Sequence, residues 1–562
     1  MKKNFVKSRW FFTMLLFVTT MIMPSMMLAQ SITPTTPKGK GTAEEPYQIS
    51  TAAELYWFAG LVNGTLPDGG GKDASANAIL TDNITVNEGV LDAVNKGQVS
   101  ESDFIEWKPI GTYDSYDAVY TGTFDGQGHT ISGLYFNHPD ASYVGLFGYI
   151  GANGKISNVG VSDSYFQFRM KGGGVCGKND KDGVLQNCSN SSTVIGKNQN
   201  SRTGGVCGDN SGTVRDCKNT GSVSGENFVG GVCGINLGTI KSCYNTGSVH
   251  GTDIYVGGVC GNSYRVTNTN YCYYLSDTAT RGIGNLMADE KDKAEKMFKE
   301  QFESGEMAWL LNGKGSGEQV WGQQLGIDQS PVPGSAYKVI KAAQGDKDAN
   351  GNYTYWATFS NLTNDVTLSV PSGRNLNVYN ATVSGGKMTL TERDKQVAKE
   401  EGVLLKTDGE YVNAINAKAN ETNDLTKASS DENHLVATPA KVKTVTADAG
   451  YKLYRLTYNN AAKEGLGFYL GSGDGKSLKA TPGKAYLQVS ENDAKDPSSA
   501  ALTRSFVFGG GSETTGIDEI TIMGTDVQRH GTIEGIFDLQ GRKISNPTKG
   551  IYIKNNKKVI IK

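Results

Sequence analysis

The apolar and polar positions of the chain repeat in register between residues 176 and 272. All eight cysteines lie there, in two columns whose members are spaced by 26 to 31 residues. The first column, preceded by G-G-V, contains Cys176, Cys207, Cys233 and Cys260, and the second contains Cys188, Cys217, Cys243 and Cys272. A unit of nearly constant length copied in tandem predicts a solenoid, in which each repeat packs on its neighbours.

Each unit has three apolar stretches separated by glycine and asparagine, which predicts three short strands. They are marked by Val175, Val206, Val232 and Val259, by Val184, Val214 and Ile240, and by Val194, Val223 and Val249. A unit of about 27 residues can form one coil whose strands lie ~4.8 Å from those of the next. We therefore expect an all-β chain with a parallel β-solenoid, and favour a right-handed coil.

Asparagine recurs at two fixed positions of the unit. Asn179, Asn210 and Asn236, with Ser263 in the fourth unit, follow the first cysteine by three residues, and Asn190, Asn219 and Asn245 follow the second by two. Asparagine tolerates corner conformations, and its amide both donates and accepts hydrogen bonds. We expect these amides to bond to the copies above and below.

The pattern extends upstream. A degenerate unit places Phe147 and Val159 in the two cysteine columns, so both columns are expected to face an apolar interior. Thr51 and Glu54 form a capping box that predicts a helix ending at Gly64. Its apolar face is predicted to contain Leu55, Phe58, Ala59 and Val62. We expect this helix to cap the open end of the solenoid, with a first strand and turn beginning at residue 78.

The repeat "GGVCGINLGTIKSCYNTGSVHG" resembles the GLUG repeat, found in secreted and surface-attached bacterial proteins and beside the catalytic domains of immunoglobulin A peptidases. Two upstream segments, "YTGTFDGQGHTISGLYF" and "GTAEEPYQISTAAELYWFAGLVN", resemble the lead-in and the usual opening of such repeats. The resemblance covers about residues 41–274. It implies a secreted or surface-attached protein.

Residues 1–29 are typical of a signal peptide, with a basic start, an apolar run and a small-residue cleavage site. The apolar run is shorter than ~20 residues and no second run of that length follows, so we expect no transmembrane anchor. The mature chain is expected outside the cell, or on its surface or outer membrane.

Residues 512–562 contain "GIFDLQGRKI" and "KGIYIKNNKKVIIK" and predict three short strands. They resemble the C-terminal sorting domain of the type IX secretion route of Gram-negative bacteria. The motif residues are Gly541, Arg542, Lys543, Gly550 and Tyr552. The resemblance implies contact with the secretion machinery; a terminal β-domain without a sorting role is the alternative.

The remaining boundaries follow from changes of pattern. We expect a capping region and first coil over 30–104, the solenoid over 105–280 and a helical linker or cap over 281–349. The linker's predicted apolar contacts are Met297, Phe298, Phe302, Met307 and Leu310. Alternating strands over 350–511 predict an antiparallel β-sandwich.

Composition adds limits to the function. The 72 glycines favour a β-rich chain with many tight corners. A net charge of −2 without a basic stripe argues against a nucleic-acid partner.

The cysteines allow two arrangements, four disulfides within coils or two ladders of buried thiols. Their spacing within a unit, 10 or 12 residues, does not suit structural zinc. Asp346, Asp348 and Asn350 are spaced as in a calcium loop, but Ala357 stands where the bidentate glutamate is needed. We expect a polar turn there, and no cofactor.

No catalytic constellation is found. The five histidines are scattered, no H-E-x-x-H occurs, and Asp125 with His129 is interpreted as a polar turn. Two equivalent positions in successive units are expected to be a solvated surface without paired carboxylates. They hold Lys178, Asp209 and Ile235, and Gln186, Asp216 and Ser242.

We therefore expect a non-catalytic, adhesin-like protein whose rigid solenoid binds a host glycan or an extracellular protein. Six tyrosines are candidates for stacking on sugar rings, although packing against turns is favoured. They are Tyr244, Tyr255, Tyr264, Tyr271, Tyr273 and Tyr274. The alternatives are a polysaccharide lyase or glycosidase built on a β-helix, and a purely structural, fimbria-like component.

Overall fold

The computed structural model describes residues 32–507 except for short gaps, and beyond them the backbone of four short strands. The gaps are 68, 98–102, 114–117, 253, 265–267, 286–292, 315–318, 348–349, 417–424, 460–464, 499–501 and 504. The predicted signal peptide lies outside the described residues. The chain forms two compact units, Met1–Lys296 and Met297–Lys562. Within the described ranges, no helix is long and apolar enough to cross a membrane.

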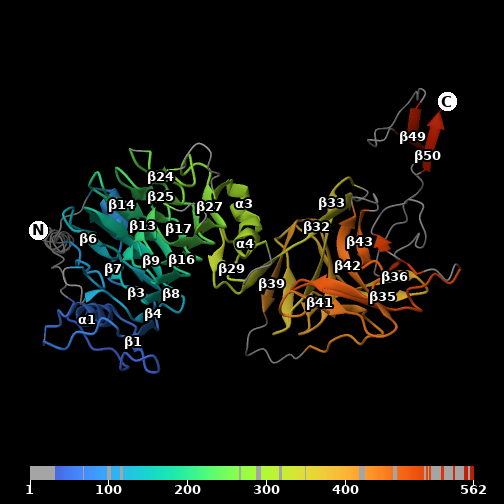
Figure 1. Cartoon of the computed structure of the whole chain (residues 1–562), viewed down its shortest axis with the longest axis horizontal. Helices are drawn as coiled ribbons and strands as arrows, with labels where there is room; N and C mark the ends of the chain where they lie inside the picture. The colour runs from blue at the N-terminus through green and yellow to red at the C-terminus, as the bar shows by residue number, and fades with distance from the viewer. Residues whose placement is uncertain are drawn as a thin grey trace, which may run out of the picture. The chain divides into compact units, whose positions relative to one another are not determined.

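The first unit is a parallel β-solenoid of about seven coils between residues 47 and 274, as predicted. Its coils follow one another from blue beside α1 to green at β27 in Figure 1. Four sheets run along the stack, so the expectation of three strands per coil is wrong. The additional strands form a fourth sheet just before the first cysteine column, where paired glycines separate them from the cysteine-bearing strands.

Sheets A and B form two sides of each coil. Sheet A contains β1 (Tyr47–Ile49), β2 (Ala78–Leu80), β4 (Thr123–Asp125), β8 (Lys155–Ser157), β12 (Val184–Gln186), β16 (Thr213–Arg215), β21 (Thr239–Lys241) and β26 (Thr269–Asn270). Sheet B contains β3 (Ile84–Thr85), β5 (Thr130–Ser132), β6 (Tyr135–Asn137), β9 (Gly160–Phe168), β13 (Ser189–Gly196), β17 (Lys218–Asn219), β18 (Val223–Ser224), β22 (Tyr244–Asn245), β23 (Val249–His250), β27 (Cys272–Leu275) and β28 (Ala294–Met297).

Sheets C and D complete the coil. Sheet C contains β7 (Phe147–Ile150), β11 (Cys176–Asn179), β15 (Cys207–Asn210), β20 (Cys233–Asn236) and β25 (Cys260–Ser263). Sheet D contains β10 (Lys171–Gly173), β14 (Arg202–Gly204), β19 (Val229–Gly230) and β24 (Val256–Gly257).

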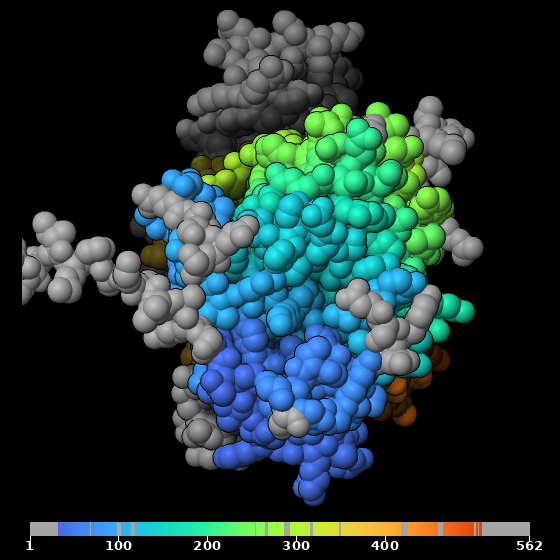
Figure 2. Space-filling model, turned by 90° about the vertical axis from the view of Figure 1, so that its left-hand side faces the viewer, coloured from blue at the N-terminus to red at the C-terminus, as the bar shows by residue number. Residues whose placement is uncertain are grey.

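Helix α1 (Ala52–Asn63) begins and ends as the sequence predicts. Thr51 and Glu54 make both hydrogen bonds of the capping box, and Gly64 ends the helix with a φ of 70°. The predicted apolar face, including Phe58, is buried in the same hydrophobic cluster as the coils. Figure 2 shows the blue N-terminal residues at one end of the stack of cyan and green coils. The helix therefore covers apolar surface that the first coil would otherwise expose.

The strand pairing sets the equivalent positions of successive coils. Phe147 pairs with Cys176, as predicted. Val184 pairs with Thr213, whereas Leu185 pairs with Val214. The alignment of Val184 with Val214 and Ile240 is therefore wrong by one position. Side chains alternate along a strand, so its buried neighbour Leu185 fills the core instead.

The cysteines form two ladders of buried, free thiols. In sheet C, Cys176, Cys207, Cys233 and Cys260 pair in register from coil to coil. Cys188 follows β12 of sheet A, so the two cysteines of one coil stand on different sides of it. Thiols of both columns donate to nearby carbonyls, as Cys233 does to Ile235 O at 3.0 Å and Cys217 to Arg215 O at 3.1 Å.

The asparagines form the expected ladders. The Asn179 amide donates to Asn210 Oδ1 at 2.9 Å, and that of Asn210 to Asn236 Oδ1 at 2.8 Å. In the second ladder, Asn190 donates to Asn219 at 2.8 Å, and Asn219 to Asn245 at 2.7 Å. These amides are fully buried, so each bond satisfies a group that would otherwise cost free energy.

The second unit begins with two short helices, α3 (Lys299–Glu303) and α4 (Glu306–Leu311). Phe302, Met307 and Leu310 are buried as expected. Phe298 is 58% exposed, which contradicts its predicted role as an apolar contact. It is the N-cap residue of α3, outside the helical turn that carries the buried face. A two-stranded sheet of β29 (Trp321–Gly322) and β30 (Val332–Pro333) follows.

Antiparallel sheets make up the rest of this unit. Sheet F contains β31 (Tyr337–Lys341), β34 (Val366–Ser369), β37 (Gln396–Val397) and β39 (Tyr411–Asn416). Sheet G contains β32 (Ala343–Lys347), β33 (Tyr353–Ser360), β35 (Leu376–Ser384), β36 (Lys387–Arg393), β38 (Gly402–Thr407) and β47 (Thr521–Met523), the last joined in parallel. Strands β31 and β32 precede residue 350 but pair with strands that follow it.

Sheet H covers the other side of sheet G, and the two-stranded sheet I packs against sheet H. Sheet H contains β40 (Leu435–Ala437), β42 (Tyr451–Asn459), β43 (Gly465–Leu470), β45 (Ala485–Ser490) and β46 (Ser505–Val507). Sheet I contains β41 (Lys443–Thr446) and β44 (Ser477–Ala480). In sheet G, Leu405 joins a core with sheet F and its neighbour Leu404 joins a core with sheet H. Sheet G is therefore buried on both faces.

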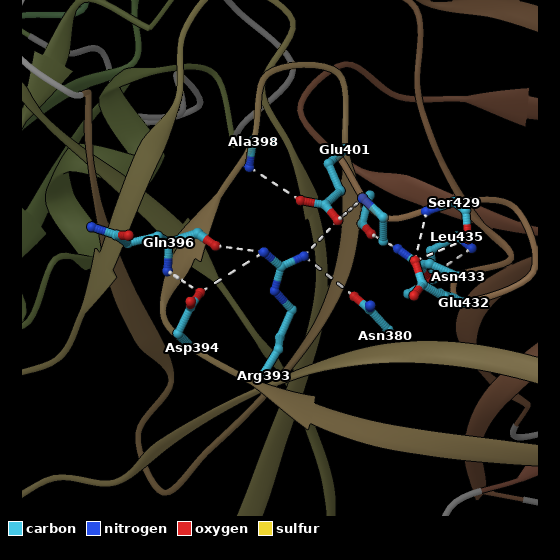
Figure 3. A network of polar contacts seen from close by, with 12 residues as sticks. Asn380, Arg393, Asp394, Gln396, Ala398, Glu401, Ser429, Glu432, Asn433 and Leu435 are labelled. Carbon is cyan, nitrogen blue, oxygen red and sulfur yellow. Dashed lines mark hydrogen bonds and ion pairs between the residues drawn. The ribbon is translucent and has the colours of Figure 1, made fainter. Parts of the chain in front are cut away.

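One ion pair anchors the loops around sheet G (Figure 3). Glu401 is fully buried, and Arg393 Nη1 lies 2.5 Å from its carboxylate. The same carboxylate accepts hydrogen bonds from the backbone N–H groups of Ala398 and Ala428, both at 3.1 Å. Arg393 also donates to Gln396 O at 2.8 Å. The buried charge is thus paired and hydrogen-bonded, as burial requires.

Candidate ligand-binding surface

The strand registers align two columns of side chains on sheets D and C. At the start of sheet D, the pairing makes Tyr143, Lys171, Arg202, Phe228 and Tyr255 equivalent. On sheet C, the equivalent residues are Tyr149, Lys178, Asp209, Ile235 and Asn262. Five positions spaced by ~4.8 Å give each column a length of about 19 Å.

Three tyrosine rings stack where the two columns begin. Tyr143 and Tyr149 have ring centroids 5.5 Å apart and an interplanar angle of 5°. Tyr113, which is 37% exposed, lies 5.0 Å from Tyr143 and 5.6 Å from Tyr149. Tyr143 is half-buried and Tyr149 is buried. The stack therefore has a rigid base and a partly open side.

Cationic side chains continue the stack along both columns. Lys171 Nζ lies 5.0 Å from the centroid of the Tyr143 ring, and Lys178 Nζ lies 4.7 Å from that of Tyr149. Both distances are within the range of cation–π attraction. Lys178 also donates to the Tyr149 hydroxyl at 2.9 Å. We call Tyr113, Tyr143, Tyr149, Lys171, Lys178, Arg202 and Asp209 the tyrosine–cation strip.

A buried carboxylate joins the two columns. Asp209 is 2% exposed, and its Oδ2 lies 3.2 Å from Lys171 Nζ and in close contact with Arg202 Nη1. Its other oxygen, Oδ1, is buried without a hydrogen-bond partner among the described residues. The arrangement holds the Lys171 and Arg202 head groups side by side over one acceptor.

The electrostatics of the strip keep Lys178 charged. Burial tends to lower its pKa, but the hydrogen bond to Tyr149 and the nearby charges of Asp180 and Asp209 raise it overall. Burial raises the pKa of Tyr149, so its hydroxyl is protonated and donates to Asp180 at 3.0 Å. The strip therefore presents fixed donors beside its aromatic rings.

Two aromatic residues of the sheet D column have unusual backbone conformations. Tyr143 has a φ of 65° and Phe228 a φ of 44°, in a region that non-glycine residues rarely occupy. At the far end of the column, Phe228 stacks on Tyr255 with centroids 4.8 Å apart. Such conformations cost about 1–3 kcal/mol and concentrate at functional sites. The strain is thus located at the aromatic ends of the column.

The predicted aromatic candidates have different fates. Tyr244, Tyr273 and Tyr274 are buried, as the favoured packing interpretation expects. Tyr255 belongs to the sheet D column, whereas Tyr264 is 65% exposed and outside both columns.

The expectation of a varied, solvated surface is wrong for the first of the two positions compared. Asp209 and Ile235 are each 2% exposed, because the sheet D column covers the sheet C column. The second position was also misaligned: Gln186 pairs with Arg215, so Asn187 is the true equivalent of Asp216. Asp216 and Ser242 are buried as well.

Asp125 is the last residue of β4, and His129 follows the turn after this strand. The Asp125 carboxylate accepts hydrogen bonds from Gln127 N at 2.9 Å and from Asn158 Nδ2 at 2.8 Å, and so fixes the corner. Asp346 lies in β32, where its backbone oxygen accepts from Thr354; Asp348 lies outside the described residues.

The C-terminal motif is described in part. Gly541, Arg542 and Lys543 lie outside the described residues. Gly550 and Tyr552 belong to β49 (Gly550–Lys554), which pairs with β48 (Ile536–Phe537) and β50 (Lys557–Ile561). The three strands form an antiparallel sheet.

Five residues of the strip were not identified from the sequence as a candidate site. They are Tyr113, Tyr143, Tyr149, Lys171 and Arg202. One signal was present: the residue five before each first-column cysteine is large, as Lys171, Arg202, Phe228 and Tyr255. The shorter unit at Phe147 shifts Tyr143 by one position and hides it from this alignment.

Comparisons with known proteins give distant similarity. No family model matches the chain, including any for GLUG repeats or sorting domains. Over 176 residues, 31% of this chain, it is 31% identical to halomucin of Haloquadratum walsbyi, of which it covers 2%. Over 127 residues, 23% of this chain, it is 33% identical to a "Putative Gly-rich membrane protein" of Evansella cellulosilytica, of which it covers 12%.

A solved structure is also similar. It is that of a "putative immunoglobulin A1 protease" from Bacteroides ovatus, 18% identical, with a TM-score of 0.38. The match covers 53% of this chain and 94% of that one.

Proposed function

We propose that this protein is an exported, non-catalytic binding protein whose solenoid holds a polysaccharide chain along the tyrosine–cation strip. The observation that carries the proposal is the triple tyrosine stack continued by Lys171, Lys178 and Arg202 over successive coils. The two columns that contain the strip run for about 19 Å along the stack, a length that suits an extended chain rather than a compact molecule.

The chemistry of the strip suits sugars. Tyrosine combines an apolar ring face, which can cover the C–H face of a sugar ring, with a polar hydroxyl. The ammonium and guanidinium groups donate hydrogen bonds to hydroxyl or acidic substituents. Because these side chains already hold one another, little rotamer entropy remains to be lost when a ligand binds.

The carboxylates in and beside the strip favour binding over hydrolysis. Glycoside hydrolysis generally needs two carboxyl groups on opposite sides of the scissile bond. Asp209 is occupied by Lys171 and Arg202, and Asp180 accepts from Tyr149. A polysaccharide lyase or glycosidase therefore remains the second candidate.

The proposal includes delivery to the cell surface through a GLUG-type, adhesin-like architecture and a C-terminal sorting domain. It is supported by the sequence motifs and by the small antiparallel sheet of β48, β49 and β50. Deleting residues 512–562 should leave the protein in the periplasm, as fractionation and surface labelling would show. Unchanged surface delivery would remove the sorting role.

The binding role is tested with the full chain on a glycan array, followed by titration of the best-bound glycan. Tyr143→Asn removes a ring but keeps a residue that tolerates a positive φ, and Lys178→Gln removes a cation. Each should weaken binding at least tenfold. The matched controls Tyr264→Ala and Lys155→Gln, at exposed positions outside the strip, should not.

The array distinguishes the alternatives. Absence of binding to any glycan would contradict the proposal and favour a structural component. Shortened glycan products after incubation would favour the enzyme.

A further inference from the structure

A cavity of about 390 Å³ lies among sheets G, H and I of the second unit. Its walls combine the side of sheet G that carries Trp356, strand β42 with Arg455, strand β44 with Lys479, and the loop that ends at Lys484. Cavities of this size bind small molecules. It is separate from the tyrosine–cation strip, which belongs to the first unit.

The charged residues that line the cavity are all cationic. Four cationic residues line it, Lys341, Arg455, Lys479 and Lys484, and none of its described lining residues is acidic. Lys341 is paired with Glu410 at 2.8 Å. The other three form no ion pair within the part of the chain that the structure describes. Three cations thus border one cavity without a counter-charge.

Lys484 is held rigidly at the edge of this cavity. Its backbone oxygen accepts from Ser360 Oγ at 2.5 Å and from Thr438 Oγ1 at 2.9 Å. The residue is half-buried, and among the described residues its ammonium has one hydrogen-bond partner, Lys341 O at 3.5 Å. Burying a cation with so little compensation is unfavourable unless a ligand supplies the missing charge.

The remaining walls indicate the rest of the ligand. Thr358, Thr438, Thr457 and Thr481 provide hydroxyl groups, and Leu456, Leu478 and the Trp356 ring provide apolar surface. A ligand with an acidic group, hydroxyls and an apolar edge would match the cations, the threonine hydroxyls and the apolar side chains of the cavity wall.

We propose that this cavity binds a small, hydroxylated anion through a carboxylate, sulfate or phosphate group. Arg455, Lys479 and Lys484 hold the acidic group, and the threonine hydroxyls and the Trp356 side hold the remainder. The proposal does not depend on glycan binding by the solenoid.

The assignment predicts a pH dependence of anion binding. Burial lowers the pKa of Lys484 to about 8, so its charge is lost as the pH rises from 7 to 9. The other ionisable groups facing the cavity are Lys341, Arg455, Lys479 and Tyr486, and burial raises the pKa of Tyr486. Anion affinity should therefore fall over this range.

The test is calorimetric titration of the full chain with glucuronate, glucose 6-sulfate and glucose 6-phosphate at constant ionic strength. At least one should bind, and the three arms identify the acidic group. Lys484→Met and Arg455→Gln should each weaken that binding at least tenfold. Lys387→Gln, an exposed lysine of β36, is the matched control and should have no effect.

A stability measurement separates a binding role from a structural one. Lys484→Met removes a poorly compensated buried charge, so at pH 7 the ligand-free variant should melt at the same temperature as the wild type or higher. Loss of anion binding without a fall in the melting temperature supports the proposal. If none of the three anions binds the wild type, or if binding survives in both variants, the proposal is wrong.

Discussion

A single left-handed residue forms the corner between sheets A and B in successive coils. Asn158, Asn187, Asp216, Ser242 and Tyr271 occupy this position with φ values between 52° and 57°. Asparagine is among the residues that best tolerate this conformation. Asp216 differs from Asn158 and Asn187 in the two preceding coils because it places a carboxylate at a buried corner.

We predict that Asp216→Asn stabilises the protein at pH 7. Burial raises the pKa of Asp216 to about 6 in the folded chain, above the ~3.9 expected when unfolded. The folded state therefore binds more protons between these values, and the wild type loses stability as the pH rises through them. The gain should be about 1–2 kcal/mol at pH 7 and vanish near pH 3. Thermal unfolding of both proteins at each pH measures it; an equal difference at both would contradict it.

The cysteine ladders predict unreactive thiols. All eight cysteine side chains are fully buried, so a thiol reagent cannot reach them in the folded chain, and the apolar surroundings disfavour the reactive thiolate. We expect no N-ethylmaleimide adduct on the native chain and eight on the chain unfolded without reductant, measured by intact mass. Fewer than eight adducts after unfolding would show disulfides.

At the residue scale, the sequence predicts those contacts that recur at the same position of every repeat. Asn179 and Asn210 recur at one spacing, so their ladder was predictable, and Phe147 marked the column as inward. The contact between Lys171 and Asp209 was not predictable, because it joins two columns whose facing depends on how the glycine-rich bend folds.

Among the elements, that bend is defined by glycines that pack against backbone. A Cβ at Gly205 would lie 2.3 Å from the Asn219 side chain, and one at Gly208 would lie 2.6 Å from Gly172 N and 2.7 Å from Gly177 O. The glycines of the motif thus allow sheet C to approach sheet D and the asparagine ladder closely.

We predict that Gly208→Ala is strongly destabilising. Backbone atoms of two neighbouring coils surround the new methyl group and cannot move aside without breaking ladder hydrogen bonds. The loss should be about 3 kcal/mol or more, at the upper end of overpacking effects. The control is Gly71→Ala, where no atom lies within 4 Å. Urea unfolding followed by circular dichroism measures both; similar midpoints would contradict this account.

An element is predictable when the residues that determine it are close together in the sequence. Helix α1 was predicted to the residue because its capping box and terminal glycine are adjacent in sequence. The strands of sheet D were missed because Lys171–Gly173 contains two glycines and has no strand propensity of its own. Only pairing with the neighbouring coils makes it a strand.

The ion pair of Arg393 and Glu401 tests the anchoring of the second unit. Arg393→Met leaves a fully buried carboxylate without its counter-charge, which typically costs about 3–5 kcal/mol. The exposed Arg374→Met is the matched control. A fall in the unfolding midpoint for Arg393→Met alone is expected, and equal midpoints for both variants would contradict it.

For the molecule as a whole, the sequence predicted a parallel solenoid followed by antiparallel sheets. It did not reveal that sheet G is buried on both faces. The run Val403-Leu404-Leu405 in β38 lacks the apolar–polar alternation of a strand with one buried face. This run is the only sign in the local sequence that β38 is buried on both faces. Which sheets supply the two covering faces depends on pairings distant in the chain.

The central claim is that the tyrosine–cation strip is where a glycan binds. Hydrogen–deuterium exchange of the full chain, with and without the best-bound glycan, tests it most directly. We expect protection confined within the first unit to residues 143–149, 171–178 and 202–209, with no change at the exposed Tyr264 segment. Protection elsewhere on the solenoid, with these three segments unchanged, would contradict it.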